Sequence, residues 1–190
     1  MSARASILGK IRGLNLQKVS LPELPEPAPV IDTQQQLVAS LERNLCTVVR
    51  SSENNLREVI HGLYPEAREI FSTIAGINGS VAWDLSSGPG ALSTLDLTVV
   101  RAEFAVAENG ALWIRQEDLE VPAACFMPSN LVVVLEEQEV VPDMHAAYRR
   151  LTFNGPFGVF IAGPSRTADI EQSLVIGAHG PLTMAVVLVN

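Results

Sequence analysis

The sequence is poor in cysteine, and this shortage excludes a large class of metalloproteins. Only Cys46 and Cys125 occur among the 190 residues, and they do not form a metal-binding motif. Because iron–sulfur clusters and structural zinc ions are held by several clustered cysteines, we expect this chain to ligate neither and to have no metal site. Two isolated cysteines are typical of a reducing compartment, so we expect buried thiols and a cytoplasmic protein.

Long apolar runs are also missing. No stretch reaches about 18 apolar residues, the length at which a segment reads as a candidate membrane helix. The N-terminal sequence MSARASILGKIRGLN has no apolar core of signal-peptide length. We therefore expect neither secretion nor membrane insertion.

Positive charge is scarce as well. Lysine and arginine number 13 against 21 aspartates and glutamates, which gives a net charge of −8. An acidic surface repels phosphate backbones, so we expect no nucleic-acid binding, although a local basic site can still hold a small anion. With 47% hydrophobic and 18% charged residues, the composition is that of a globular domain and not of a disordered chain.

The N-terminal region differs in pattern from the rest of the chain. Residues 2–14 have the spacing of a short helix with one apolar face. Four prolines follow within the segment LPELPEPAP, and they indicate an extended linker because proline interrupts helices and sheets. We therefore expect residues 1–29 to be a helix and a Pro-rich linker, and residues 30–190 to form a single domain.

From residue 30 onward, helical and strand patterns alternate. Helical spacing is found over residues 33–45, 52–65, 143–151 and 167–177. Strand character is found over residues 46–51, 68–74, 97–103, 131–141, 157–163 and 182–190. This alternation predicts an α/β fold with a mainly parallel sheet flanked by helices. Asn109-Gly110, between two apolar runs, adds an antiparallel hairpin with a tight turn that needs positive φ at both residues.

The segment GPSRTADIEQSLVIGAHGP, residues 163–181, is rich in polar and turn-forming residues. One interpretation is a strand-to-helix connection, in which Ser165 and Thr167 cap a helix and Asp169 suits its dipole. This interpretation does not explain Arg166, because a cation is unfavourable at a helix N-terminus. The other interpretation is an anion site beyond the carboxyl end of a parallel strand. Its ligand-binding residues are Ser165, Arg166, Thr167 and Asp169.

Two further polar residues are catalytic candidates. His179 is either a turn histidine satisfied by the backbone or a proton-transfer group. A short connection from the expected helix places it at the opposite end of the sheet from Arg166. Glu108, just before the expected hairpin turn, is either a solvated acid or a functional carboxylate.

The segment 163–181 closely resembles the C-terminal signature of the LutC-type lactate utilization proteins, the LUD domain family. The sequence AENGALW, residues 107–113, is similar to a second landmark of the family, and ILGKIR looks like the start of these proteins. The resemblance implies the fold of the glucosamine-phosphate isomerase, ribose-phosphate isomerase and CoA-transferase superfamily. In the CoA-transferase relatives a glutamate is the covalent nucleophile, and Glu108 is the positional candidate here.

The resemblance also implies a role in L-lactate oxidation to pyruvate, with two partner proteins that carry iron–sulfur clusters. We therefore expect an accessory, non-redox subunit with no bound cofactor, no catalytic activity alone, and an anion-binding turn for a small carboxylate or phosphate at Gly163–Asp169. Two alternatives are a free-standing enzyme acting on a small phosphorylated or CoA-linked acid, by analogy of fold, and a ligand-sensing regulator. Assembly into a homo-oligomer also stays open.

Overall fold

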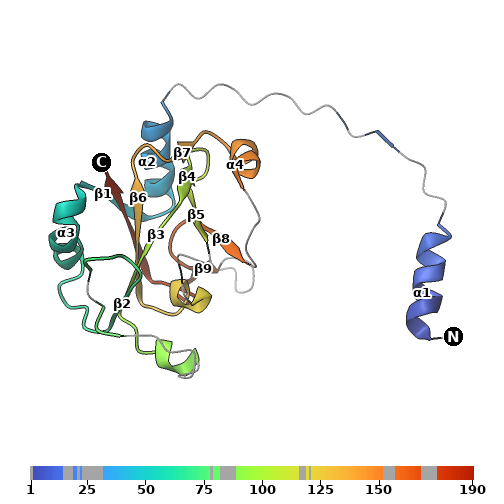
Figure 1. Cartoon of the computed structure of the whole chain (residues 1–190), viewed down its shortest axis with the longest axis horizontal. Helices are drawn as coiled ribbons and strands as arrows, with labels where there is room; N and C mark the ends of the chain where they lie inside the picture. The colour runs from blue at the N-terminus through green and yellow to red at the C-terminus, as the bar shows by residue number, and fades with distance from the viewer. Residues whose placement is uncertain are drawn as a thin grey trace.

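Five parallel strands form the central sheet of the computed structural model (Figure 1). The structure describes residues 2–14, 19–20, 22, 32–77, 79–81, 89–115, 119, 121–151, 157–167 and 175–190. In order across the sheet, the strands are β1 (Cys46–Ser51), β11 (Thr183–Val189), β6 (Asn130–Glu136), β3 (Leu97–Arg101) and β2 (Ile70–Ser72). All four neighbouring pairs are parallel, so the predicted parallel sheet is confirmed.

The central strands β6 and β11 are buried along nearly their whole length. Alternate residues of β6 face opposite layers of the fold. Val133 packs in the core cluster that contains Leu37 and Leu41 of α2 (Thr33–Arg43), whereas Val132 packs with Leu56 and Ile60 of α3 (Leu56–Leu63). Because both faces of the sheet are covered, the strands read as continuous apolar runs.

A second sheet lies on the same side of the central sheet as α2 (Figure 1). Its strands, in spatial order, are β7 (Val140–Val141), β4 (Phe104–Val106), β5 (Ala111–Arg115) and β8 (Gly158–Ile161). The predicted hairpin is confirmed, since β4 and β5 pair antiparallel. Its turn differs from the expected tight turn, because four residues connect the strands and, among the described residues of the loop, only Gly110 has positive φ.

The expected strand over residues 131–141 is two strands in different sheets. β6 ends at Glu136, and a turn closed by the 2.9 Å bond from the Glu139 N–H to the Glu136 carbonyl leads into β7. Val140 then pairs with Ala105 of the second sheet. The acidic, polar stretch after Glu136 ends the buried strand, and this signal is present in the sequence.

Two aspartates cap the helices that they precede. The Asp32 carboxylate accepts hydrogen bonds from two N–H groups at the start of α2, and Asp143 accepts one from Ala146 in α4 (Met144–Arg150). Among the residues that the structure describes, no helix has both the length and the apolar character needed to cross a bilayer. The other helical segments that the structure describes are α1 (Ala3–Arg12), η1 (Glu53–Asn55), η3 (Pro89–Leu92) and η5 (Pro122–Cys125).

Helix α1 stands apart from the α/β body in Figure 1. None of its residues is buried, and Ile7 and Ile11 are 58% and 57% exposed. Most of the expected Pro-rich linker lies outside the described residues. The division into an N-terminal helix with a linker and a single domain stays a prediction.

Candidate functional site

The C-terminal segment begins where β8 ends. β8 is an antiparallel strand of the second sheet, so the expectation that Gly163 follows the carboxyl end of a parallel strand is wrong. The expected helix over residues 167–177 is also wrong at both ends, because β9 (Arg166–Thr167) pairs antiparallel with β10 (Val175–Ile176). The residues between these strands, Asp169 among them, lie outside the part that the structure describes. Ser165 directly precedes β9, and Thr167 is the last residue of β9.

Arg166 has a structural contact that its sequence position did not reveal. Its Nη2 lies 3.3 Å from the carbonyl oxygen of Arg43, the last residue of α2. A cation is favourable at a helix C-terminus, where carbonyl groups lack partners within the helix. A guanidinium has five N–H donors, so this one contact leaves donors for another acceptor.

The charge of Arg166 also acts on the thiol of Cys46, the first residue of β1. Burial raises the pKa of Cys46 to about 11, and the positive charge of Arg166 partly opposes this rise. Burial alone raises the pKa of Cys125 to about 12. Both thiols are free and buried, as the sequence predicted, and both are protonated at neutral pH.

Ser165 forms hydrogen bonds with residues near the other end of the C-terminal segment. The His179 N–H lies 3.4 Å from the Ser165 Oγ, and the Ser165 N–H donates to the carbonyl of Pro181 at 2.9 Å. The expectation that His179 and Arg166 lie at opposite ends of the sheet is therefore wrong. The reason is that β10 returns beside β9, with Ile176 opposite Arg166 in the register. Both His179 and Arg166 are exposed.

The glycines of this segment allow close approaches that a side chain would block. Gly163 has φ +110°, and a Cβ there would lie 2.6 Å from the backbone oxygen of Asn44. Gly177 has φ +80°, and a Cβ there would lie 2.1 Å from the Leu182 side chain. The shape of the segment thus depends on Gly163 and Gly177.

Glu108 lies in the loop between β4 and β5. Its exposed carboxylate accepts a 3.1 Å hydrogen bond from the Met144 N–H at the start of α4, where a negative charge is favourable. The Ser40 hydroxyl of α2 donates to the loop at the Ala107 carbonyl, 2.7 Å away. The Asn44 side chain, just after α2, donates to the loop at the Asn109 carbonyl, also 2.7 Å away.

The C-terminal end of α2 therefore holds two segments that are far apart in the sequence. The Glu108 loop binds through Ser40 and Asn44, and the C-terminal segment binds through the Arg43 carbonyl. The sequence pattern pointed to both segments but not to α2, because serine, arginine and asparagine are common residue types and their partners here lie far away in the sequence. We treat this junction of Glu108 loop, α2 end and C-terminal segment as the candidate site.

A chain of hydrogen bonds at the amino-terminal ends of the strands was also missed. The Tyr64 hydroxyl lies 3.0 Å from the Thr183 Oγ1, which lies 2.7 Å from the Asn130 Oδ1. Asn130 donates to the Asp96 carbonyl at 2.8 Å. Burial is the main cause that raises the pKa of Tyr64, and N–H groups of Glu69 and Arg68 lower the pKa of Asp96. The chain links three parallel strands, β11, β6 and β3, at their starting ends.

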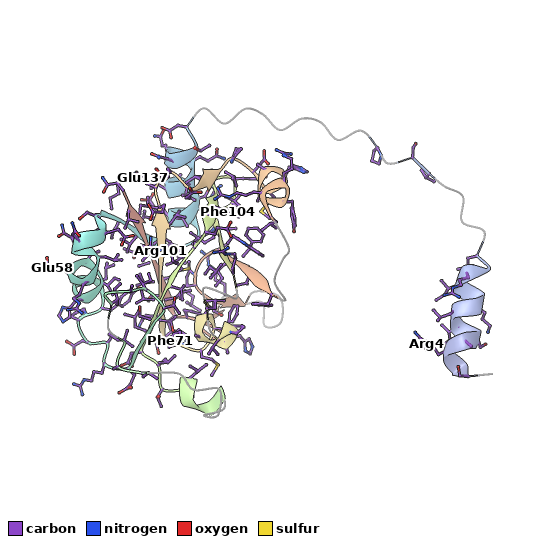
Figure 2. All side chains as sticks on the ribbon, viewed as in Figure 1. Arg4, Glu58, Phe71, Arg101, Phe104 and Glu137 are labelled. Carbon is purple, nitrogen blue, oxygen red and sulfur yellow. The ribbon has the colours of Figure 1, made fainter. Side chains whose placement is uncertain are left out.

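The opposite, carboxyl edge of the sheet is charged. Arg101, at the end of β3, pairs with Glu53 at 2.5 Å and with Glu136 at 3.0 Å. Arg50 pairs with Glu137 at 2.8 Å, and Figure 2 labels Arg101 and Glu137. Open α/β sheets often bind ligands at this edge.

Metal-binding side chains do not cluster in the described part of the chain. Within those residue ranges, no group of three or more histidine, cysteine, aspartate or glutamate side chains could hold a metal ion.

Known proteins match this chain in sequence and in fold. The sequence model of the LUD domain family matches residues 91–189, which include the Glu108 loop and the C-terminal segment. Lactate utilization protein C of Bacillus pumilus is 34% identical over 100 residues, covering 49% of this chain and 42% of that protein. Lactate utilization protein C of Exiguobacterium is 31% identical over 119 residues, covering 57% and 51%. The chain spans about half the length of the curated relatives it matches.

A solved structure supports the fold. The crystal structure of a DUF162 family protein from Deinococcus radiodurans matches with a TM-score of 0.60 and covers 86% of this chain and 100% of that one. Sequence identity is 17%, so this likeness bears on the fold alone.

Proposed function

The chain belongs to the LUD domain family, and on that premise we propose that it is an accessory, non-redox component of an L-lactate utilization system. Its relatives are called lactate utilization protein C. The observation that carries the proposal is the junction at the end of α2. There, one helix end holds two of the three segments in which the LUD resemblance lies, and both are within the range that the family model matches.

The junction has the chemistry to bind a small carboxylate. Arg166 and His179 are exposed, and both lie next to Ser165 in the fold. A guanidinium binds a carboxylate through two parallel N–H donors, and a neighbouring histidine can add a donor or move a proton. We infer that Ser165, Arg166 and His179 hold the ligand, with L-lactate, pyruvate or phosphate as the class of anion. Thr167 and Asp169 remain proposed members of the same turn.

The redox step belongs to other chains in this proposal. Oxidation of L-lactate to pyruvate removes two electrons and two protons, and the electrons need an acceptor. Iron–sulfur clusters are held by cysteine thiolates, whereas this chain has two cysteines whose thiols are buried and protonated at neutral pH. We therefore propose iron–sulfur proteins as the partners that accept the electrons.

Growth on L-lactate tests the proposal in the cell. Removal of the gene should abolish growth on L-lactate, and the unchanged gene should restore it. A gene carrying Arg166→Ala should restore growth poorly, whereas Arg149→Ala, which removes an exposed arginine on α4, should restore it fully. Normal growth without the gene would reject the lactate role. Equal rescue by both variants would reject Arg166 as a functional residue.

A further inference from the structure

A groove runs between α3 and the segment that follows β2. Its inner part is a cavity of about 320 Å³ with a mostly apolar lining that includes Ile60, Ala67, Ile70 and Leu97. This volume is at the lower end of the range of small-molecule pockets. The groove lies on the opposite face of the central sheet from α2, so it is separate from the junction described above.

A second hollow, of about 250 Å³, continues the groove toward the carboxyl edge of the sheet. Arg57 and Ile77 line both hollows, so the two adjoin at these residues. The outer hollow is also lined by Glu53 and Asn54, which follow β1, and by Gly76, which follows β2. The groove thus opens at the edge where open α/β sheets often bind ligands.

Two basic side chains, Arg57 and His61, line the apolar cavity. Arg57 and His61 are one helical turn apart on α3, both line the cavity, and both are exposed. In the part of the chain that the structure describes, Arg57 has no ion pair. Glu53, the acid at the outer hollow, is already paired with Arg101 at 2.5 Å. Glu58, the residue after Arg57, is exposed on α3 (Figure 2).

We propose that this groove binds a small amphiphilic carboxylate. Its apolar part packs against Ile60, Ile70 and Leu97, and its carboxylate lies between Arg57 and His61. An apolar cavity alone would bind neutral and anionic molecules alike. The Arg57 guanidinium at its mouth, in a chain of net charge −8, selects an anionic head group. The proposal is independent of the lactate role, because it uses none of the residues at the α2 junction.

Calorimetry with octanoate on the full chain tests the proposal. Octanoate should bind saturably at one site with a dissociation constant of about 1 mM or below. It should also displace the fluorescent anion 8-anilinonaphthalene-1-sulfonate. Octanol and octyl phosphate serve as the neutral and phosphate counterparts. Absence of saturable octanoate binding would overturn the proposal, and so would a preference for octyl phosphate over octanoate.

Variants locate the site. The double variant Arg57→Gln/His61→Gln should weaken octanoate binding about tenfold and leave octanol binding nearly unchanged. Arg149→Gln removes an exposed arginine on α4 and is the matched control. Equal octanoate affinity in the double variant and the control would overturn the proposal.

Filling the cavity is the second test. Ala67→Phe should abolish octanoate binding while circular dichroism shows an unchanged fold. Octanoate binding that survives this substitution would place the ligand elsewhere and overturn the proposal. Should Ala67→Phe fail to fold, the Arg57/His61 double variant decides, because both side chains are exposed and the fold does not depend on them.

Discussion

The guanidinium of Arg166 lies 3.3 Å from the carbonyl oxygen of Arg43, so the end of α2 holds the C-terminal segment. The next residue, Asn44, holds the Glu108 loop through its 2.7 Å hydrogen bond to the Asn109 carbonyl. Two segments that are more than fifty positions apart in the printed sequence are thereby fixed relative to each other by one helix end.

Replacement of Arg166 separates its structural role from its proposed binding role. Arg166→Ala should lower the free energy of unfolding by less than about 1 kcal/mol, because one exposed contact at a helix C-terminus is lost. The same variant should weaken the binding of L-lactate or phosphate measured by calorimetry. Arg166→Lys keeps the charge and should retain part of the affinity. Unchanged anion affinity in Arg166→Ala would move the anion site away from this turn.

Gly163 should be intolerant of any side chain. Gly163→Ala puts a Cβ 2.6 Å from the Asn44 backbone oxygen at φ +110°, so we expect a loss of about 2–3 kcal/mol in the free energy of unfolding. Gly62→Ala is the matched control, because Gly62 lies in α3 with nothing within 4 Å of its added Cβ. This control should raise stability by up to about 1 kcal/mol. Urea unfolding measures both, and equal effects would contradict the close approach.

The two cysteines should make the fold sensitive to alkali. Folding raises the pKa of Cys46 to about 11 and that of Cys125 to about 12, above the ordinary thiol value. The two protonated thiols therefore stabilise the folded state fully below the ordinary thiol pKa. This stabilisation is lost as pH rises through the pKa values of the folded state, by up to about 1.4 kcal/mol per unit of pKa difference. Unfolding monitored between pH 8 and pH 11 should show this decline.

Single alanine variants provide the control for this pH dependence. Cys46→Ala and Cys125→Ala should each reduce the loss in the free energy of unfolding as pH rises, whatever the stability of each variant at neutral pH. Both thiols should also react slowly with a thiol reagent in the folded protein and fully in urea. A rapidly reacting thiol in the folded state would contradict the burial.

The N-terminal helix is predicted to serve assembly and not folding. Deletion of residues 1–29 should leave the thermal unfolding of the α/β body unchanged, because no residue of α1 is buried. It should reduce co-purification with the proposed iron–sulfur partners, since the exposed Ile7 and Ile11 can dock on another chain. Co-purification that is equally strong with and without the segment would exclude this surface.

Much of the fold could be predicted because its signals are local. The apolar runs of β6 and β11 indicate buried parallel strands, and Asp32 and Asp143 stand where helix caps are expected. The LUD resemblance read from the segment 163–181 is confirmed by the family match. These features depend on neighbours within a few positions.

The candidate site could be predicted only in part, because its geometry depends on long-range contacts. Arg166 has no favourable role at a helix start, but it contacts the end of a different helix, α2, which ends at Arg43. The return of β10 beside β9 brings His179 to Ser165, and no local pattern distinguishes that path from a helical one. The carboxylates that pair with Arg101 come from two other segments, at Glu53 and Glu136.

The most direct test of the central claim is L-lactate-dependent dye reduction by purified proteins. The account predicts no reduction and no absorbance of a cofactor with this chain alone. It predicts reduction when the iron–sulfur partners are added, at a rate that falls when this chain is left out or carries Arg166→Ala. Dye reduction by the chain alone would contradict the accessory role, as would an undiminished rate in its absence.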